Sequence, residues 1–208
     1  IFGANAQIDK TQLSLDVSKK YNDNLKLLTQ YTWKRSVEAF VDKDKVMSSL
    51  SSVTIGQDGK MVVNVIQEQS YTQKKPGIRG AMQENAVSDM NAYIKNAIEL
   101  TMKYIFPSQG QMVDLFNKGT LSLLDNNTLQ AEGFNLLNQG DRLNYKYNKT
   151  TLDCLSQDIS TVMNGDPVKA IVAYENMDGL NRVKSVQLTL PAKNVVINLS
   201  NAEYAKKL

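Results

Sequence analysis

Histidine is absent from the 208 residues of this chain, and cysteine occurs once, at Cys154. Without histidine the chain lacks the commonest general base at neutral pH, the usual metal ligand and the middle member of hydrolase triads. A single thiol cannot form an intrachain disulfide, a zinc-thiolate cluster or a CxxC redox pair. We therefore expect no metal site and no cofactor, and we interpret Cys154 as a small buried hydrophobe rather than a reactive thiol.

Long hydrophobic runs and clustered charge are also missing. No stretch of the chain beyond its first six residues approaches the roughly 18 to 20 apolar residues of a membrane helix. The 24 basic and 21 acidic residues give a net charge of +3 and are spread along the chain, whereas nucleic-acid binders gather their basic residues. The sequence predicts a soluble chain with no nucleic-acid partner, and its 42% hydrophobic residues suffice for one good core.

The first residues have the character of an export signal. The segment Ile1-Phe2-Gly3-Ala4-Asn5-Ala6-Gln7 places an Ala-x-Ala triplet after apolar residues, which is typical of a signal-peptide cleavage site. Residues 1–6 are then a signal-peptide remnant and the mature chain starts at Gln7; an ordinary chain end is the alternative. Because no cysteine follows the site and no disulfide can form, we expect an unlipidated protein of the bacterial periplasm.

Hydrophobic periodicity predicts a helix followed by a strand meander in the first half. A helical stripe predicts a helix over 9–30, and alternation with Arg35 on the apolar face predicts a strand over 31–41. Strands over 45–56 and 61–68 flank Asp58-Gly59, a favoured hairpin turn. Pro and Gly indicate a loop over 71–80, and helical spacing predicts helices over 82–106 and 109–118. The stripe of the first helix comprises Leu13, Val17, Tyr21, Leu25 and Leu28.

The second half alternates between apolar and polar residues, with turn signals at short intervals. No helix-length segment separates its strands, so the sheet is expected to be antiparallel throughout. A sheet of about ten strands cannot stay flat, because strand twist accumulates. The sequence therefore predicts an α+β fold, a strongly curved half β-barrel wrapped around two or three helices. It would form one domain over 7–208, with a helical insertion at about 81–118. The strands are predicted over 120–124, 128–136, 142–148, 151–163, 167–176, 182–190 and 194–200.

This order of elements resembles the periplasmic lipoprotein carriers of the Lol system and their half-barrel relatives, which include an anti-sigma-factor regulator's sensor domain and mycobacterial lipid-binding lipoproteins. The features that carry the resemblance are the N-terminal helix leading into Tyr31-Thr32-Trp33-Lys34-Arg35, the helical insertion, and the closing Asp178-Gly179 hairpin with its last strand. The resemblance is closer to uncharacterised members than to the carrier. It implies a cavity for acyl chains between sheet and helices, and a latch-like role for an early-strand arginine, here Arg35.

A concave apolar wall with open ends is also, on physical grounds, a natural ligand site. If the faces are as drawn, the ligand-binding residues are Tyr31, Trp33, Arg35, Val63, Val65, Met90, Ile94 and Ile98. An ordinary core is the alternative for the apolar members. For Arg35, a charge that needs a partner or a solvent-facing position, the alternative is a rim residue with a solvated head. The loop bearing Lys74, Lys75 and Arg79 allows transient contact with a membrane surface, or is simply solvated.

The sequence thus favours a non-enzymatic periplasmic carrier for a hydrophobic ligand, a lipid or the acyl chain of a lipoprotein. Glu38, Asp42, Asp44 and Glu68 lie at strand ends or on polar faces without an evident partner in a cleft, so no carboxylate pair suits glycoside cleavage. The main alternative is a protein-binding or regulatory module of the same fold without a lipid ligand, whose partner is another protein of the cell envelope.

Overall fold

The computed structural model describes the backbone of residues 9–71 and 78–207, and the side chains of 9–71 and 85–207. The predicted signal-peptide remnant, Lys74, Lys75 and the side chain of Arg79 lie outside these residues. The elements are α1 (Lys10–Leu28), β1 (Tyr31–Val41), β2 (Asp44–Ile55), β3 (Met61–Ser70), α2 (Ile78–Ile105), α3 (Gln109–Lys118), β4 (Thr120–Leu123), β5 (Thr128–Phe134), β6 (Arg142–Asn148), β7 (Cys154–Met163), β8 (Asp166–Met177), β9 (Leu180–Leu190) and β10 (Val195–Lys206).

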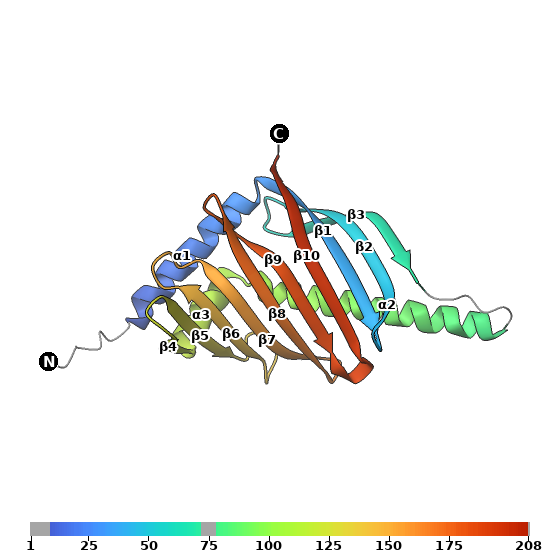
Figure 1. Ribbon diagram of the computed structural model, residues 1–208. Coiled ribbons are helices and arrows are strands. Elements are labelled where there is room, and N and C mark those ends of the chain that lie inside the picture. The colour runs from blue at the N-terminus through green and yellow to red at the C-terminus, as the bar shows by residue number, and fades with distance from the viewer. Residues whose placement is uncertain (1–8, 72–77, 208) are drawn as a thin grey trace.

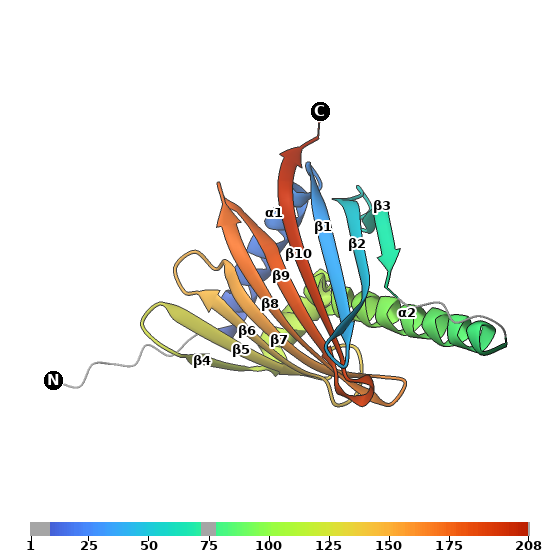
Figure 2. The same ribbon diagram turned by 45° about the vertical axis from the view of Figure 1, so that its right-hand side comes forward.

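All ten strands form one antiparallel sheet in the order β3-β2-β1-β10-β9-β8-β7-β6-β5-β4. The last strand pairs with the first, so β1 to β3 extend one side of the sheet and β9 to β4 the other (Figure 1). The sheet stays open, with β3 and β4 as its edges. The strands converge at one end and splay at the other (Figure 2), as accumulated twist requires. The predicted α+β half-barrel is confirmed.

The helices lie on the concave side of the sheet (Figures 1 and 2). Helix α1 begins at Asp9, whose carboxylate accepts hydrogen bonds from the backbone N–H groups of Thr11 and Gln12, a standard N-cap. It packs against α3 and β9, whereas α2 crosses under β7 and β8. Helix α3 begins with a capping box between Ser108 and Gln111. The helices therefore cover the middle of the sheet, and α2 extends past the edge strand β3.

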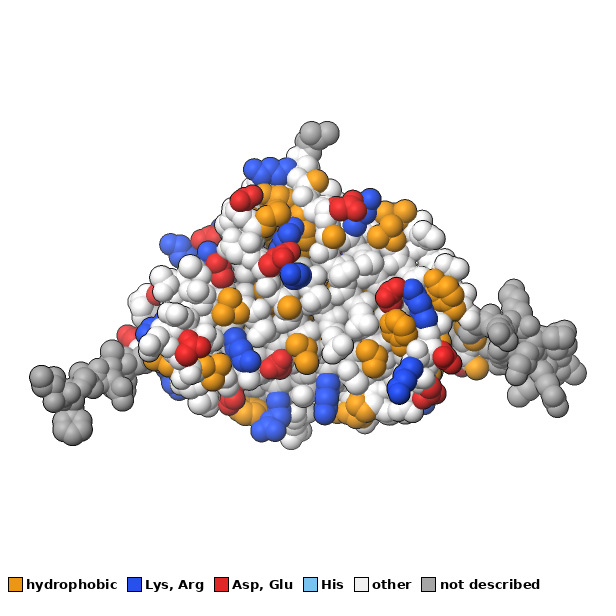
Figure 3. All heavy atoms as spheres, in the orientation of Figure 1, with side chains coloured by type: hydrophobic (Ala, Val, Ile, Leu, Met, Phe, Trp, Pro, Cys, Tyr) orange, Lys and Arg blue, Asp and Glu red, His pale blue; other side chains and the backbone are white. Residues whose placement is uncertain are grey.

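The core lies between these helices and the inner face of the sheet. Alternate residues of the strands are buried, such as Val168, Ala170 and Val172 on β8, as the alternation predicted. The predicted stripe of α1 also faces inward, with Val17 and Leu28 buried and the rest partly buried. The outer face carries scattered rather than gathered charges (Figure 3), which fits the even distribution of charge along the sequence.

Three predicted boundaries are wrong by more than a residue or two. Helix α2 begins at Ile78, inside the predicted loop 71–80, because Pro76 and Gly77 precede its first turn instead of interrupting it. Strand β7 begins at Cys154 instead of residue 151, after Leu152, whose φ is 57°. Strand β10 continues to Lys206, six residues past its predicted end, although apolar alternation stops at Leu199. Asn201, in that extension, is buried and polar.

Candidate functional site

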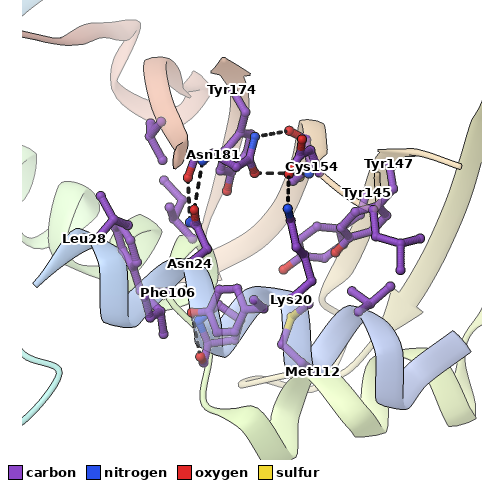
Figure 4. A pocket seen from close by; sticks show the side chains of 18 residues that line it. Lys20, Asn24, Leu28, Phe106, Met112, Tyr145, Tyr147, Cys154, Tyr174 and Asn181 are labelled. Atoms are coloured by element: carbon purple, nitrogen blue, oxygen red, sulfur yellow. Dashed lines mark hydrogen bonds and ion pairs between the residues drawn. The ribbon is translucent and has the colours of Figure 1, made fainter. Parts of the chain in front are cut away.

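The inner face of the sheet encloses a cavity of about 50 Å³ beneath α1 (Figure 4). Its walls come from α1, from the junction between α2 and α3, and from β6 to β9. Ligand pockets usually measure roughly 300 to 1,000 Å³, so most of the concavity is filled by core side chains. The apolar lining comprises Val17, Tyr21, Leu25, Leu28, Ile105, Phe106, Pro107, Met112, Tyr145, Tyr147, Leu152, Cys154, Tyr174 and Val183.

Polar groups gather along one side of the cavity, where α1 meets the sheet. Lys20 Nζ on α1 lies 3.1 Å from Asp153 Oδ1, and Asp153 Oδ2 accepts a hydrogen bond of 2.9 Å from Asn176. One helical turn further, Asn24 donates to the backbone carbonyl of Asn181 at 2.6 Å and accepts from its N–H at 2.8 Å. The Asn181 side chain in turn bonds the backbone N–H and carbonyl of Cys154. These contacts attach α1 to the start of β9 (Figure 4).

Four phenols and one thiol line the cavity, and burial disfavours the charged form of each. Desolvation raises the pKa of Tyr21, Tyr145, Tyr147 and Tyr174 above the usual value, and it raises the pKa of the Cys154 thiol as well. Nucleophilic cysteine chemistry needs the thiolate, which this raised pKa disfavours; Cys154 itself is partly buried. The cavity wall is mainly apolar and rich in aromatic rings, and its charges are the Lys20–Asp153 ion pair on one side.

The side chain of Gln157 forms hydrogen bonds with the hydroxyl groups of two of these phenols and so orients their rings. This fully buried side chain donates to Tyr145 Oη at 2.8 Å and to the Tyr104 carbonyl at 2.9 Å, and its Oε1 accepts from Tyr174 at 3.2 Å. Tyr21 donates to the carbonyl of Pro107 at 2.9 Å. Because a buried hydroxyl without a partner is costly, these bonds fix the ring positions and hence the shape of the cavity wall.

The predicted binding residues of β1 lie in a second cluster, next to the cavity. Trp33 is 2% exposed and stacks on Tyr204, with ring centroids 5.2 Å apart. Arg35 is 5% exposed and donates from Nε to Asn201 Oδ1 at 3.0 Å and from Nη1 to the sulfur of Met61 at 3.2 Å. No carboxylate of the described residues forms an ion pair with Arg35, and burial lowers its pKa to about 10. Tyr31 packs against the same cluster.

The other predicted residues lie elsewhere. Ile94 is buried in the main core, and Met90 and Ile98 pack against it from α2. Val63 and Val65, on the edge strand β3, are 46% and 57% exposed. None of the eight predicted residues is among those that line the cavity, so the structure does not bring them together at one site. Their role in ligand binding stays a prediction.

The residues that sequence reasoning missed are polar side chains within or beside the elements that meet at the cavity and at the Arg35 cluster. Lys20 and Asn24 fall one turn apart beside the apolar stripe of α1, which is a weak signal for a polar margin. Asn201, which accepts hydrogen bonds from both Trp33 and Arg35, gives no pattern signal because it lies beyond the last alternating residue of β10. Among the described residues no cluster of metal-ligating side chains occurs. No described helix has the length and hydropathy needed to cross a membrane.

Two solved structures are similar to this chain over nearly its whole length. A DUF1329 family protein from Desulfovibrio piger is 11% identical, with a TM-score of 0.48, over 97% of this chain and 95% of that one. A LolA superfamily protein from Nitrosomonas europaea is 8% identical, with a TM-score of 0.39, over 94% of each chain. No protein-family model and no curated protein matches the sequence. Similarities at this level carry no further argument, and we infer no ligand from them.

Proposed function

We propose that this protein is a non-enzymatic binding or carrier protein of the periplasm, and that the apolar chain of a lipid or acylated protein occupies the cavity beneath α1. The observation that carries the proposal is the neutral, aromatic-rich cavity between α1 and β6 to β9, with polar groups on one side only. An apolar chain in such a space gains roughly 0.8 kcal/mol for each buried CH₂. The paired charges of Lys20 and Asp153 leave the headgroup unspecified.

The cavity must enlarge to hold more than the end of a chain. At about 50 Å³ it is several times smaller than usual ligand pockets. The direct polar attachments of α1 at the cavity are few, namely those of Lys20, Tyr21 and Asn24. We propose that α1 moves away from β9 on binding, since breaking these bonds disturbs no strand pairing. Residues 7–208 would act as one domain in this movement.

The absence of catalysis is part of the proposal. The chain has no histidine, and its only thiol is kept protonated by burial. Asp153, the one carboxylate at the cavity, is held by Lys20 and Asn176. A general base close to its proton donor is therefore missing from the described lining of the cavity.

A cavity-filling variant tests the proposal. Val17 lines the cavity, and Val17→Phe places a ring in space that a ligand would need. Leu27→Phe is the matched control, because Leu27 is exposed on the same helix and away from the cavity. Binding of cis-parinaric acid is measured by its fluorescence, with thermal unfolding as a check on folding. We expect Val17→Phe to weaken binding at least tenfold and Leu27→Phe to leave it unchanged.

Equal affinity of the two variants, or a parent protein that binds no fatty acid, would contradict a ligand site beneath α1. Native mass spectrometry of protein purified from a bacterial periplasm should also show bound acyl species. The same spectra give the mature N-terminus, which we expect at Gln7. A start upstream of Gln7 would remove the proposed cleavage site but not the cavity.

A further inference from the structure

The edge strand β3 is exposed on both faces along most of its length. Val62, Val63, Val65 and Ile66 are 44%, 46%, 57% and 56% exposed. Among the described side chains, α2 contacts β3 near the strand's end, through an ion pair of 3.0 Å between Lys95 and Glu68 and a 3.5 Å bond from Asn91 to Ser70. The β-branched side chains in the middle of the strand are exposed, and β3 forms one edge of the sheet (Figure 1).

Such an edge is unusual, because natural sheets protect long edge strands with charges, proline or bulges. The ten residues Met61–Ser70 contain one charge, Glu68, and no proline or glycine. The only protective feature is a shift of register against β2, where Ser51 pairs with Val65 but Leu50 with Gln67. On one side of this bulge, Met61 to Val65 keep regular pairing with β2. The opposite edge, β4, has only four residues.

We propose that β3 pairs with β3 of a second copy of the chain, antiparallel and centred on Asn64. The strand reads alike in both directions from Asn64: Val63 faces Val65, and Val62 faces Ile66 of the copy. Val63 and Val65 both belong to the inner face, since they register with Val53 and Ser51, so facing side chains meet on one side of the joined sheet. The contact has two-fold symmetry and closes as a dimer.

Charge favours this arrangement over the parallel one. Parallel strands in register would set the two Glu68 carboxylates side by side, whereas the antiparallel register holds them far apart. The bulge at Ile66 limits the regular ladder to about Val63–Val65, with Val62 facing the bulged Ile66 at each end. So short a ladder buries less surface than the roughly 1,200 to 2,000 Å² of stable interfaces. The dimer is therefore weak, and forms mainly at high concentration or when other contacts hold two copies together.

Cysteine cross-linking tests the register. Asn64→Cys places two thiols opposite each other across the two-fold axis, at the 4.5 to 5.5 Å Cα separation of antiparallel neighbours, which a disulfide spans. Val62→Cys places the same pair roughly 14 Å apart along the ladder. Ile171→Cys, exposed on β8, and the parent chain with its native Cys154 are controls. Under mild oxidation we expect Asn64→Cys to form linked dimers at least tenfold faster than any of these.

Sedimentation velocity of the unmodified chain provides a test without variants. We expect the dimer fraction to rise between about 10 and 1,000 μM, as for a small interface, and Val63→Lys to remain monomeric throughout. Cross-linking of Asn64→Cys no faster than Ile171→Cys, or a parent that is monomeric at all concentrations, overturns the proposal and leaves β3 as an edge for a strand of another protein. Equal cross-linking of Val62→Cys and Asn64→Cys overturns the register.

Discussion

Asn201 should be the residue on which the buried cluster around Arg35 depends most. Its Oδ1 accepts two hydrogen bonds, from Trp33 Nε1 at 3.1 Å and from Arg35 Nε at 3.0 Å. Its Nδ2 donates to the carbonyl of Val183, which Tyr204 Oη also reaches at 3.1 Å. Asn201→Leu keeps the approximate shape but removes the acceptor. Two buried donors lose their partner, at about 1 to 3 kcal/mol each, so we expect a loss of about 3 to 5 kcal/mol.

The variant Asn201→Asp tests the acceptor oxygen by itself, because it keeps this oxygen and changes the rest of the amide. The carboxylate still accepts both bonds and pairs with Arg35, but its second oxygen replaces the donor Nδ2 and opposes the Val183 carbonyl, which keeps its bond from Tyr204. Desolvation of the new charge offsets its pairing, so we expect a change within about 1.5 kcal/mol. Urea unfolding followed by the fluorescence of Trp33, the only tryptophan, measures both. The exposed Asn198→Leu on the same strand is the control.

An Asn201→Leu variant within about 1 kcal/mol of the parent, below the range for even one unsatisfied donor, would refute this reasoning. Equal losses from Asn201→Leu and Asn201→Asp would also do so, because they would make the Nδ2 donor to Val183 or the packing of the amide, not its acceptor, responsible. A change of the urea slope would mean that the variant altered the unfolded state or broke two-state behaviour. In that case unfolding by heat, followed by circular dichroism, decides between the two readings.

Three further predictions concern other parts of the molecule. Arg35→Leu removes a buried charge that has no carboxylate partner among the described residues, and it should change the free energy of unfolding by less than about 2 kcal/mol. The same variant should alter the rate at which cis-parinaric acid is released. An unchanged release rate would mean that Arg35 has a structural role only. Gly119→Ala brings a Cβ within 2.3 Å of two backbone carbonyls and should lower the thermal midpoint by several degrees, whereas Gly110→Ala, with open space around it, should raise it. Burial raises the pKa of several phenols above the unfolded value of about 10. Their contribution to stability is therefore complete below pH 10 and is lost as the pH rises toward the folded pKa. Absorbance at 295 nm should show these phenols ionising together when the protein unfolds. They are Tyr21, Tyr145, Tyr147, Tyr174 and Tyr204.

The antiparallel pairing of successive strands and most element bounds could be predicted because local signals are strong in this chain, whereas the pairing of β1 with β10 was not predicted. Strand β1 occupies the predicted residues 31–41, where five apolar residues alternate with polar ones before the turn at Asp42. Several later strands are likewise bounded by Asn, Asp or Gly residues with positive φ, such as Asn164 and Asp178, which these residue types tolerate best. With no helix-length connection available, antiparallel neighbours were the only topology that short turns permit.

The site was harder to predict, because alternation reports two faces of a strand and not what lies against them. Val63 and Val65 alternate as buried residues do, yet β3 is an edge that α2 barely covers. The cavity depends on where α1 rests on β6 to β9, a contact between segments more than 100 residues apart. Its polar margin consists of Lys20, Asn24 and Asp153, whose residue types are ordinary on any surface.

The predicted cluster and the observed cavity are nevertheless joined through one residue of β9. Val183 lines the cavity with its side chain, and its carbonyl accepts hydrogen bonds from Asn201 and Tyr204. Arg35 is therefore two hydrogen bonds from the cavity wall, through Asn201. Because cores repack in discrete steps rather than deform continuously, a change at Arg35 that shifts Asn201 should reach the wall through Val183. An arginine outside the cavity can thus influence its opening without touching the ligand.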